Sequence, residues 1–265
     1  AALKILANYR RPLLVHAEIP QPSEDEQKGI DVDNSERRMY STYLRTRPPC
    51  WEEEAVKEIT RVAKDTLLDG PMDGAHIHIV HLSDSSASLD LIKEAKESGA
   101  RISVETCPHY LAFSAEDIRD GDTRFKCAPP IRDALNREHL WEALKDGHID
   151  MLSSDHSPSS PELKLFETGD FLRAWGGISS LQFGLPVTWS YGKQHGLGLV
   201  QLSEWWSRRP AILAGQHKKI LSWGAGMDEP VVGQEAVISY GTDIKDGGIY
   251  WCSSSAVRLL DSKLG

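Results

Sequence analysis

The sequence has few cysteines, no long apolar run and no surplus of basic residues, and each shortage excludes a class of protein. The four cysteines are scattered without a Cys-x-x-Cys pair, at Cys50, Cys107, Cys127 and Cys252. This excludes a disulfide scaffold or a local zinc finger, so we interpret them as reduced thiols. No apolar run approaches the roughly 20 residues of a membrane span. The 30 basic and 39 acidic residues give a net charge of −9, which argues against a nucleic-acid partner.

What remains is a hydrophobic content of 40% spread over 265 residues, enough for one or two globular domains. Short apolar runs alternate with helical patterns. We predict strands at 13–15, 77–80, 102–104 and 149–152, and helices at 51–63, 89–98 and 140–144. Such alternation is typical of a parallel sheet covered by helices. The acidic stretch 21–35 is predicted to be a lid or surface loop, residues 202–206 and 211–214 to be helical, and residues 231–232, 236–238 and 249–251 to be short strands.

Three of the predicted strands end at or close to residues that can bind a metal ion or transfer a proton. The first ends at His16, the second at His81, and the fourth is followed by Asp155. In a parallel α/β barrel the carboxyl ends of the strands open on one face, where active sites are built. Two imidazoles and a carboxylate there suit zinc, and Asp155 could also act as general base. The alternatives are hydrogen-bonded histidines at strand ends and an Asp155 that caps a helix together with Ser157.

Two loops are candidate substrate contacts. The segment around Cys127 and Ala128 precedes two prolines, which fix the backbone and remove two donors. The pair Gly176-Gly177 would let the backbone approach a ligand closely. Cys127 is not expected to be a nucleophile, because no base is identifiable for it. His76 and His78 precede His81 on the same strand, at the wrong end for a barrel site, so a structural role is predicted for them.

Six stretches together resemble the cyclic amidohydrolases, and among them the plant-type allantoinases. They are PLLVHAE (12–18), HIVHLS (78–83), ETCPHYL (105–111), KCAPPIRD (126–133), DMLSSDHSP (150–158) and AWGGISSLQ (174–182). The resemblance covers about residues 1–216, and the motifs occur in the family's order. It implies a TIM-like (β/α)8 barrel, of which this chain would hold the fifth to eighth βα units.

The resemblance also implies an activity, the hydrolysis of allantoin to allantoate in purine catabolism, and a site. In the family two zinc ions are bridged by hydroxide and by a carbamylated lysine. Carried onto this sequence, His16 and His81 would bind one metal, and Asp155 would bind the other and act as general base. The backbone at Cys127, Ala128, Gly176 and Gly177 would hold the ring, with Ser157 nearby. His109 and His156 are predicted to lie just outside the ligand sphere.

Two departures from the family are large. Its His-x-His pair and its lysine precede the strand that carries His16, and they have no counterpart here. Residues 217–265 also diverge from the family's small β-domain, so we expect a barrel half at 1–216 and a divergent segment at 217–265. The chain begins without Met and is expected to be a truncated form, inactive and poorly folded by itself.

Alternatives stay open within and beyond this chemistry. Hydantoin, dihydropyrimidine or dihydroorotate hydrolysis could use closely similar metal sites, since loops select the substrate. A non-catalytic assembly protein with the same fold is a third possibility. The expected partner is a small cyclic ureide, without nucleic acid or a membrane span. By resemblance the complete protein would be a homotetramer in the cytoplasm or endoplasmic reticulum.

Overall fold

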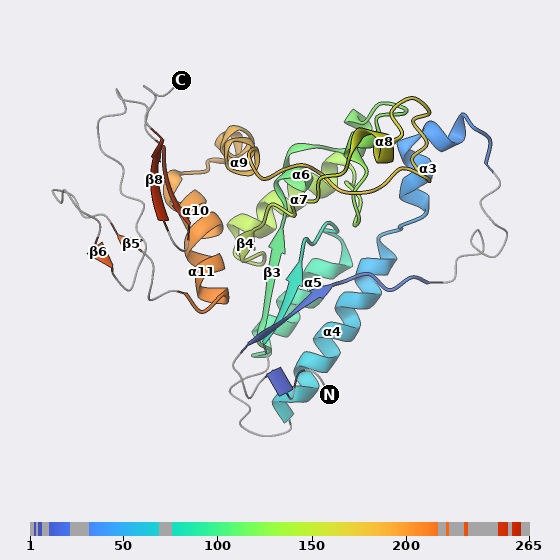
Figure 1. Ribbon diagram of the computed structural model, residues 1–265. Helices are drawn as coiled ribbons and strands as arrows, with labels where there is room; N and C mark the ends of the chain where they lie inside the picture. Colours follow the sequence, from blue (N-terminus) through green and yellow to red (C-terminus); the bar gives the residue numbers. More distant parts are fainter. Residues whose placement is uncertain are drawn as a thin grey trace. The chain divides into compact units, whose positions relative to one another are not determined.

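The computed structural model places a four-stranded parallel sheet at the centre of the first part of the chain (Figure 1). The structure describes residues 3, 5–6, 11–21, 32–68 and 76–216, and the backbone of 221–222, 231–232, 249–253 and 256–260. Two compact units are formed, residues 1–188 and 189–265. The boundary expected at 216/217 stays a prediction.

The sheet has the order β1-β2-β3-β4. Its strands are β1 (Pro12–His16), β2 (His76–Val80), β3 (Ile102–Thr106) and β4 (Met151–Leu152). All three pairings are parallel, as the apolar runs predicted. The fourth strand begins two residues later than expected. Asp150 N–H still donates to Val104 O and Ser153 N–H to Thr106 O, so the ladder continues on both sides of β4.

The register gives the sheet two unlike faces, because paired residues of parallel neighbours point to the same side. One face is aliphatic, formed by Leu13, Val15, Ile77, Ile79, Ile102 and Val104. The other carries polar side chains, listed along the strands as His16, His76, His78, Ser103 and Glu105, beside the half-exposed Leu14. The chain therefore alternates apolar and polar positions within strands that looked continuously apolar.

The helices of the first unit are placed by local signals. Their bounds are α3 (Tyr40–Arg45), α4 (Cys50–Leu68), α5 (Ala87–Glu97), α6 (Pro108–Ala112), α7 (Ala134–Lys145) and α8 (Pro161–Lys164). Helix α4 follows Pro48-Pro49 and has Glu52 and Glu53 in its first turn, where the helix dipole favours acid. Figure 1 shows α4 and α5 beside each other along the sheet.

Some predicted elements were too short or were missed. Helix α7 begins six residues before the predicted Leu140, because Asp133 caps it by accepting a hydrogen bond from Asn136 N–H at 2.8 Å. Helices α3, α6 and α8 were not predicted, and each is only four to six residues long. Gly99 ends α5 as predicted, with a φ of +85° that glycine adopts at little cost. The predicted lid at 21–35 lies largely outside the described residues.

The second unit is described by itself. Helix α9 (Gly184–Gly192) spans the division between the units, and α10 (Leu199–Ser203), a π-helical turn (Glu204–Arg208) and α11 (Arg209–Leu213) follow. The predicted helices at 202–206 and 211–214 fall within this run. Two antiparallel pairs complete it: β5 (Leu221–Ser222) with β6 (Val231–Val232), and β7 (Ile249–Ser253) with β8 (Ala256–Leu260). The strand predicted at 236–238 lies outside the described residues.

Candidate metal and catalytic site

The structure brings His16 and His81 together at the carboxyl ends of β1 and β2. His16 Nδ1 lies 3.0 Å from His81 Nε2, although 65 positions separate the residues. Two nitrogen ligands of one tetrahedral zinc ion, each at about 2.0–2.1 Å, lie about 3.3 Å apart. The two ring nitrogens are therefore already spaced as neighbouring ligands of a single metal would be.

His81 is the more enclosed of the two histidines. Burial lowers its pKa, and the neighbouring His16 lowers it further, while Asp155 and Glu105 act in the opposite direction. Its Nδ1 atom is buried and has no hydrogen-bond partner among the described residues. A neutral imidazole is the form that binds a metal, so this surrounding favours a ligand role.

Asp155 follows β4 by three residues, and its charge acts on His81. One carboxylate oxygen of Asp155, Cys107 Sγ and a ring nitrogen of His109 all lie within 4.8 Å of one another. No helix begins at Asp155: the next one starts at Pro161 after Ser160. The helix-cap alternative is therefore excluded, and the hydroxyl of Ser157 donates instead to the carbonyl of Asp155 at 3.0 Å.

The backbone at His81 and Asp155 adopts a conformation that L-residues rarely use. Their φ angles are +41° and +42°, and among described non-glycine residues only Leu165 is also positive. Such left-handed residues cost about 1–3 kcal/mol each and gather at functional sites.

His109 and His156 differ in their surroundings. His109 is 3% exposed, and neither ring nitrogen has a partner among the described residues. Burial lowers its pKa to about 3, with His81 adding to the effect, so it is a neutral ring facing the site. The Nδ1 atom of His156 accepts hydrogen bonds from Ser180 N–H at 3.0 Å and Leu181 N–H at 3.1 Å. His156 thus holds the loop that follows Gly177.

The predicted substrate loops meet each other. Gly177 N–H donates to the carbonyl of Lys126 at 2.8 Å, next to Cys127 and Ala128. A β-carbon on Gly177, whose φ is +113°, would lie 2.3 Å from Ser157 O, so glycine is required there. Tyr43 donates its hydroxyl hydrogen to the carbonyl of Cys127 at 2.7 Å. These contacts bring Cys127, Ser157, Gly176 and Gly177 close together, and Ala128 is the next residue of the chain after Cys127.

Cys127 itself is poorly suited to nucleophilic chemistry. Its thiol is buried, and burial raises its pKa to about 12, with Asp155 raising it further. Two lysines beside it were not predicted. Lys126 donates to Leu172 O at 3.1 Å and Ala174 O at 2.7 Å, and burial lowers its pKa to about 8. Lys164 is buried and donates to Gly177 O. No sequence signal marked either lysine, because each acts by binding backbone carbonyls of distant loops.

His76 and His78 make hydrogen bonds to residues of the neighbouring strand, as expected for the structural role that was predicted for them. His76 Nε2 lies 2.8 Å from Ser103 Oγ, and His78 Nε2 lies 3.0 Å from a carboxylate oxygen of Glu105. The donors at the strand ends are the His16–His81 pair, whose ring nitrogens lie 3.0 Å apart, and a group of Cys107, His109 and Asp155. Imidazole, carboxylate and thiol donors suit a borderline metal such as zinc.

The comparisons with known proteins agree with this geometry. No family model matches the chain. It is 66% identical over 218 residues to a probable allantoinase of rice, covering 82% of this chain and 42% of that protein. Identity to an allantoinase of Arabidopsis thaliana is 63% over 217 residues, with the same coverage of 82% and 42%. The chain thus spans less than half the length of these curated relatives.

Solved structures give the fold. An L-hydantoinase (dihydropyrimidinase) from Arthrobacter aurescens matches with a TM-score of 0.69 at 27% identity, over 82% of this chain and 46% of that one. A dihydroorotase from Saccharomyces cerevisiae matches with a TM-score of 0.61 at 16% identity, over 81% and 52%. The parallel sheet is part of a TIM-like barrel, and by sequence the chain is similar to plant allantoinases over 82% of its own length.

Proposed function

We propose that this chain supplies part of the active site of a metal-dependent allantoinase, which hydrolyses the cyclic amide of allantoin to give allantoate. The observation that carries the proposal is the 3.0 Å approach of His16 Nδ1 to His81 Nε2. Identity of 66% to a probable allantoinase supports the choice of substrate. The proposed ligands of one metal are His16 and His81, and Asp155 binds the second.

In this proposal each group of residues has a separate role in catalysis. Bound zinc would polarise the scissile carbonyl and lower the pKa of water. Asp155 takes a proton from the attacking water and passes it to the leaving ring nitrogen, as a general base and then a general acid. The backbone of Cys127, Ala128, Gly176 and Gly177 orients the ring. The entropy cost of this orientation is then met on binding and no longer adds to the activation free energy. His109, being neutral and enclosed, keeps that side of the site free of extra charge.

Further features of the complete enzyme belong to the same proposal. By resemblance, the second zinc ion would also need a bridging carbamylated lysine and a His-x-His pair from strands that precede β1 in the family. His76 and His78 are not that pair, since they contact Ser103 and Glu105. By the same reasoning the chain alone should be inactive. We also propose a homotetramer and an intracellular location, cytoplasmic or in the endoplasmic reticulum. None of the described helices is both long and apolar enough to cross a bilayer.

A specific observation favours a second candidate. Two of the similar solved structures are a hydantoinase and a dihydropyrimidinase, and loops rather than metal ligands select the ring. Hydrolysis of a hydantoin or dihydropyrimidine is therefore the alternative.

The deciding experiment is a substrate panel on a protein in which this chain is extended to the length of its relatives. We expect zinc-dependent hydrolysis of allantoin, and little or none of hydantoin, dihydrouracil or dihydroorotate. The 265-residue chain assayed alone should show no turnover. Hydrolysis of a dihydropyrimidine without any of allantoin would replace the first candidate by the second, and absence of all four activities would reject both.

A further inference from the structure

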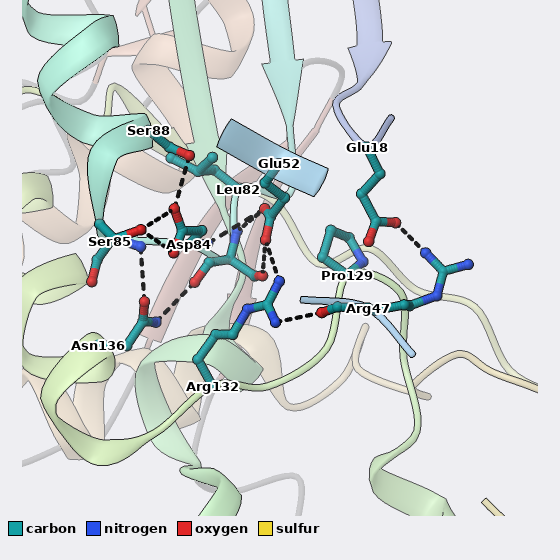
Figure 2. A network of polar contacts seen from close by, with 12 residues as sticks. Glu18, Arg47, Glu52, Leu82, Asp84, Ser85, Ser88, Pro129, Arg132 and Asn136 are labelled. Atoms are coloured by element: carbon teal, nitrogen blue, oxygen red, sulfur yellow. Dashed lines mark hydrogen bonds and ion pairs between the residues drawn. The ribbon is translucent and has the colours of Figure 1, made fainter. Parts of the chain in front are cut away.

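Figure 2 shows a series of charged side chains that includes Glu18, Arg47, Arg132 and Glu52. It begins at Glu18, whose side chain is 2% exposed. One carboxylate oxygen of Glu18, Oε2, lies 2.8 Å from His16 Nε2 and also accepts a hydrogen bond from Arg47. Glu18 thus lies directly behind one of the two proposed histidine ligands.

These contacts fix which nitrogen of His16 carries the proton. Glu18 forms an ion pair with Arg47 through Oε2, the same oxygen that lies 2.8 Å from His16 Nε2. An ionised carboxylate can only accept hydrogen bonds. His16 Nε2 must therefore be the donor, which leaves Nδ1 of the neutral ring with a lone pair. That lone pair is on the atom that faces His81.

Arg47 is itself held in place. Its carbonyl accepts a hydrogen bond from Arg132 Nη1 at 2.6 Å, and Arg132 Nη2 donates to Glu52 Oε2 at 2.9 Å. Glu52 and Arg132 form an ion pair with side chains only 1% and 5% exposed. Such pairs are costly to bury and remain fixed when every charge is matched.

The series ends at the second histidine. Glu52 accepts hydrogen bonds from Ser83 N–H at 2.9 Å and from Ser83 Oγ at 2.6 Å. Ser83 lies two residues after His81, and its carbonyl accepts from Asn136 Nδ2 at 2.8 Å. The turn that carries His81 is therefore attached to the same group of charges that orients His16.

We propose that Glu18 is a positioning residue of the metal site: it holds His16 as the Nε2–H tautomer, presents Nδ1 to the metal, and is held in turn by Arg47. A carboxylate behind a metal-binding histidine sets both the tautomer and the ring orientation. The inference rests on the proposed function only in taking His16 as a ligand, and it does not depend on the substrate.

This role can be tested by two measurements, neither of which needs a substrate. Both use the protein extended to the length of its relatives. The first is the affinity for Co²⁺, followed by its visible absorption against a competing chelator. We expect Glu18→Ala to weaken binding about 10–100-fold. Glu18→Gln should lose less, because its amide oxygen still accepts from Nε2–H. Glu58→Gln is the control, since Glu58 is exposed and pairs with Arg61 on the outer surface of α4, and its affinity should equal that of the unchanged protein.

The second measurement is the tautomer of His16 in the metal-free protein, from the ¹⁵N shifts of its two ring nitrogens. The unchanged protein should show Nε2 protonated and Nδ1 bare, and Glu18→Ala should show a mixture. A merely structural role for Glu18 would lower stability and leave the tautomer alone. A protonated Nδ1 in the unchanged protein would overturn the proposal even if Glu18→Ala failed to fold. Equal Co²⁺ affinity in Glu18→Ala would overturn it as well, and neither result depends on allantoin being the substrate.

Discussion

The two faces of the four-stranded sheet are made from the same strands but have opposite chemistry. On one face Ile77, Ile79 and Val104 are almost completely buried, as expected for the face that packs against helices. On the other face Leu14 is 57% exposed, and His78 and Glu105 form a buried hydrogen-bonded pair. In a closed TIM-like barrel this second face is the interior. The comparison indicates that the aliphatic face maintains the fold, whereas the proposed chemistry belongs to the strand ends and not to the histidines of the polar face.

The largest effect should come from a strand end. We expect Asp155→Asn to lower allantoin turnover of the extended protein about 10²–10⁴-fold, because an amide cannot accept and return the proton. The free energy of unfolding should change little, since Asp155 caps no helix. Steady-state kinetics and denaturant unfolding would measure both. Asp90→Asn, on the exposed side of α5, should change neither, and an Asp155→Asn enzyme that retained turnover would remove Asp155 from its role.

A second change tests the charges that join the strand ends. Arg132→Met leaves Glu52 buried without its partner and should lower the free energy of unfolding by about 3–5 kcal/mol. Lys57→Met removes the exposed pair with Glu54 and should change it by less than about 0.5 kcal/mol. Denaturant titration of both variants is the measurement. Equal, small losses would mean that the buried pair is not maintained in solution.

A third change compares the two faces directly. Ile79→Ala should cost about 2–5 kcal/mol of unfolding free energy, since the side chain is completely buried. Leu14→Ala should cost less than about 0.5 kcal/mol in the 265-residue chain. In the protein extended to its relatives' length, Leu14→Ala should cost more, because a closed barrel encloses that face. A Leu14→Ala cost that is the same in both forms would contradict the assignment of this face to the barrel interior.

The smallest effect concerns pH. Burial, with His78 and Arg101 adding to it, lowers the pKa of His76 from 6.5 to about 4. The unfolded chain therefore binds the proton first as the pH falls, and the folded state loses stability between pH 6.5 and 4. Because His76 is only partly buried, we expect the loss to be about 1 kcal/mol. Unfolding of His76→Gln and the unchanged protein at pH 7 and pH 4.5 would show it, and identical pH dependence would exclude His76 as its source.

The sequence was sufficient for the sheet and for the residues at its strand ends. Apolar runs located all four strands, and His16, His81 and Asp155 stood out because each follows such a run. The parallel ladder then places them on one edge, so their proximity follows from topology. The polar face was less visible, since the alternation of histidine with isoleucine at 76–79 resembles a ligand cluster, and only the position of these histidines early in the strand favoured a structural role.

What the sequence could not provide are contacts made across long separations. Glu52 and Arg132 are 80 positions apart, and neither follows a strand or belongs to a recognisable spacing. Lys164 donates a hydrogen bond to the carbonyl of Gly177. No sequence pattern predicts how the loop between these two residues folds back. Glu18 was visible only as part of a motif, and its role depends on Arg47, which approaches from the segment between two helices. Short helices such as α6 and α8 carry too few residues for a periodic pattern.

The central claim is that three strand ends deliver His16, His81 and Asp155 to one metal site. Anomalous X-ray scattering from crystals of the extended protein grown with zinc tests it most directly. The account predicts a peak about 2.0–2.2 Å from His16 Nδ1 and His81 Nε2, and zinc coordination by the Asp155 carboxylate at a similar distance. Zinc found only at Cys107 and His109, with His16 and His81 still in contact with each other, would contradict it.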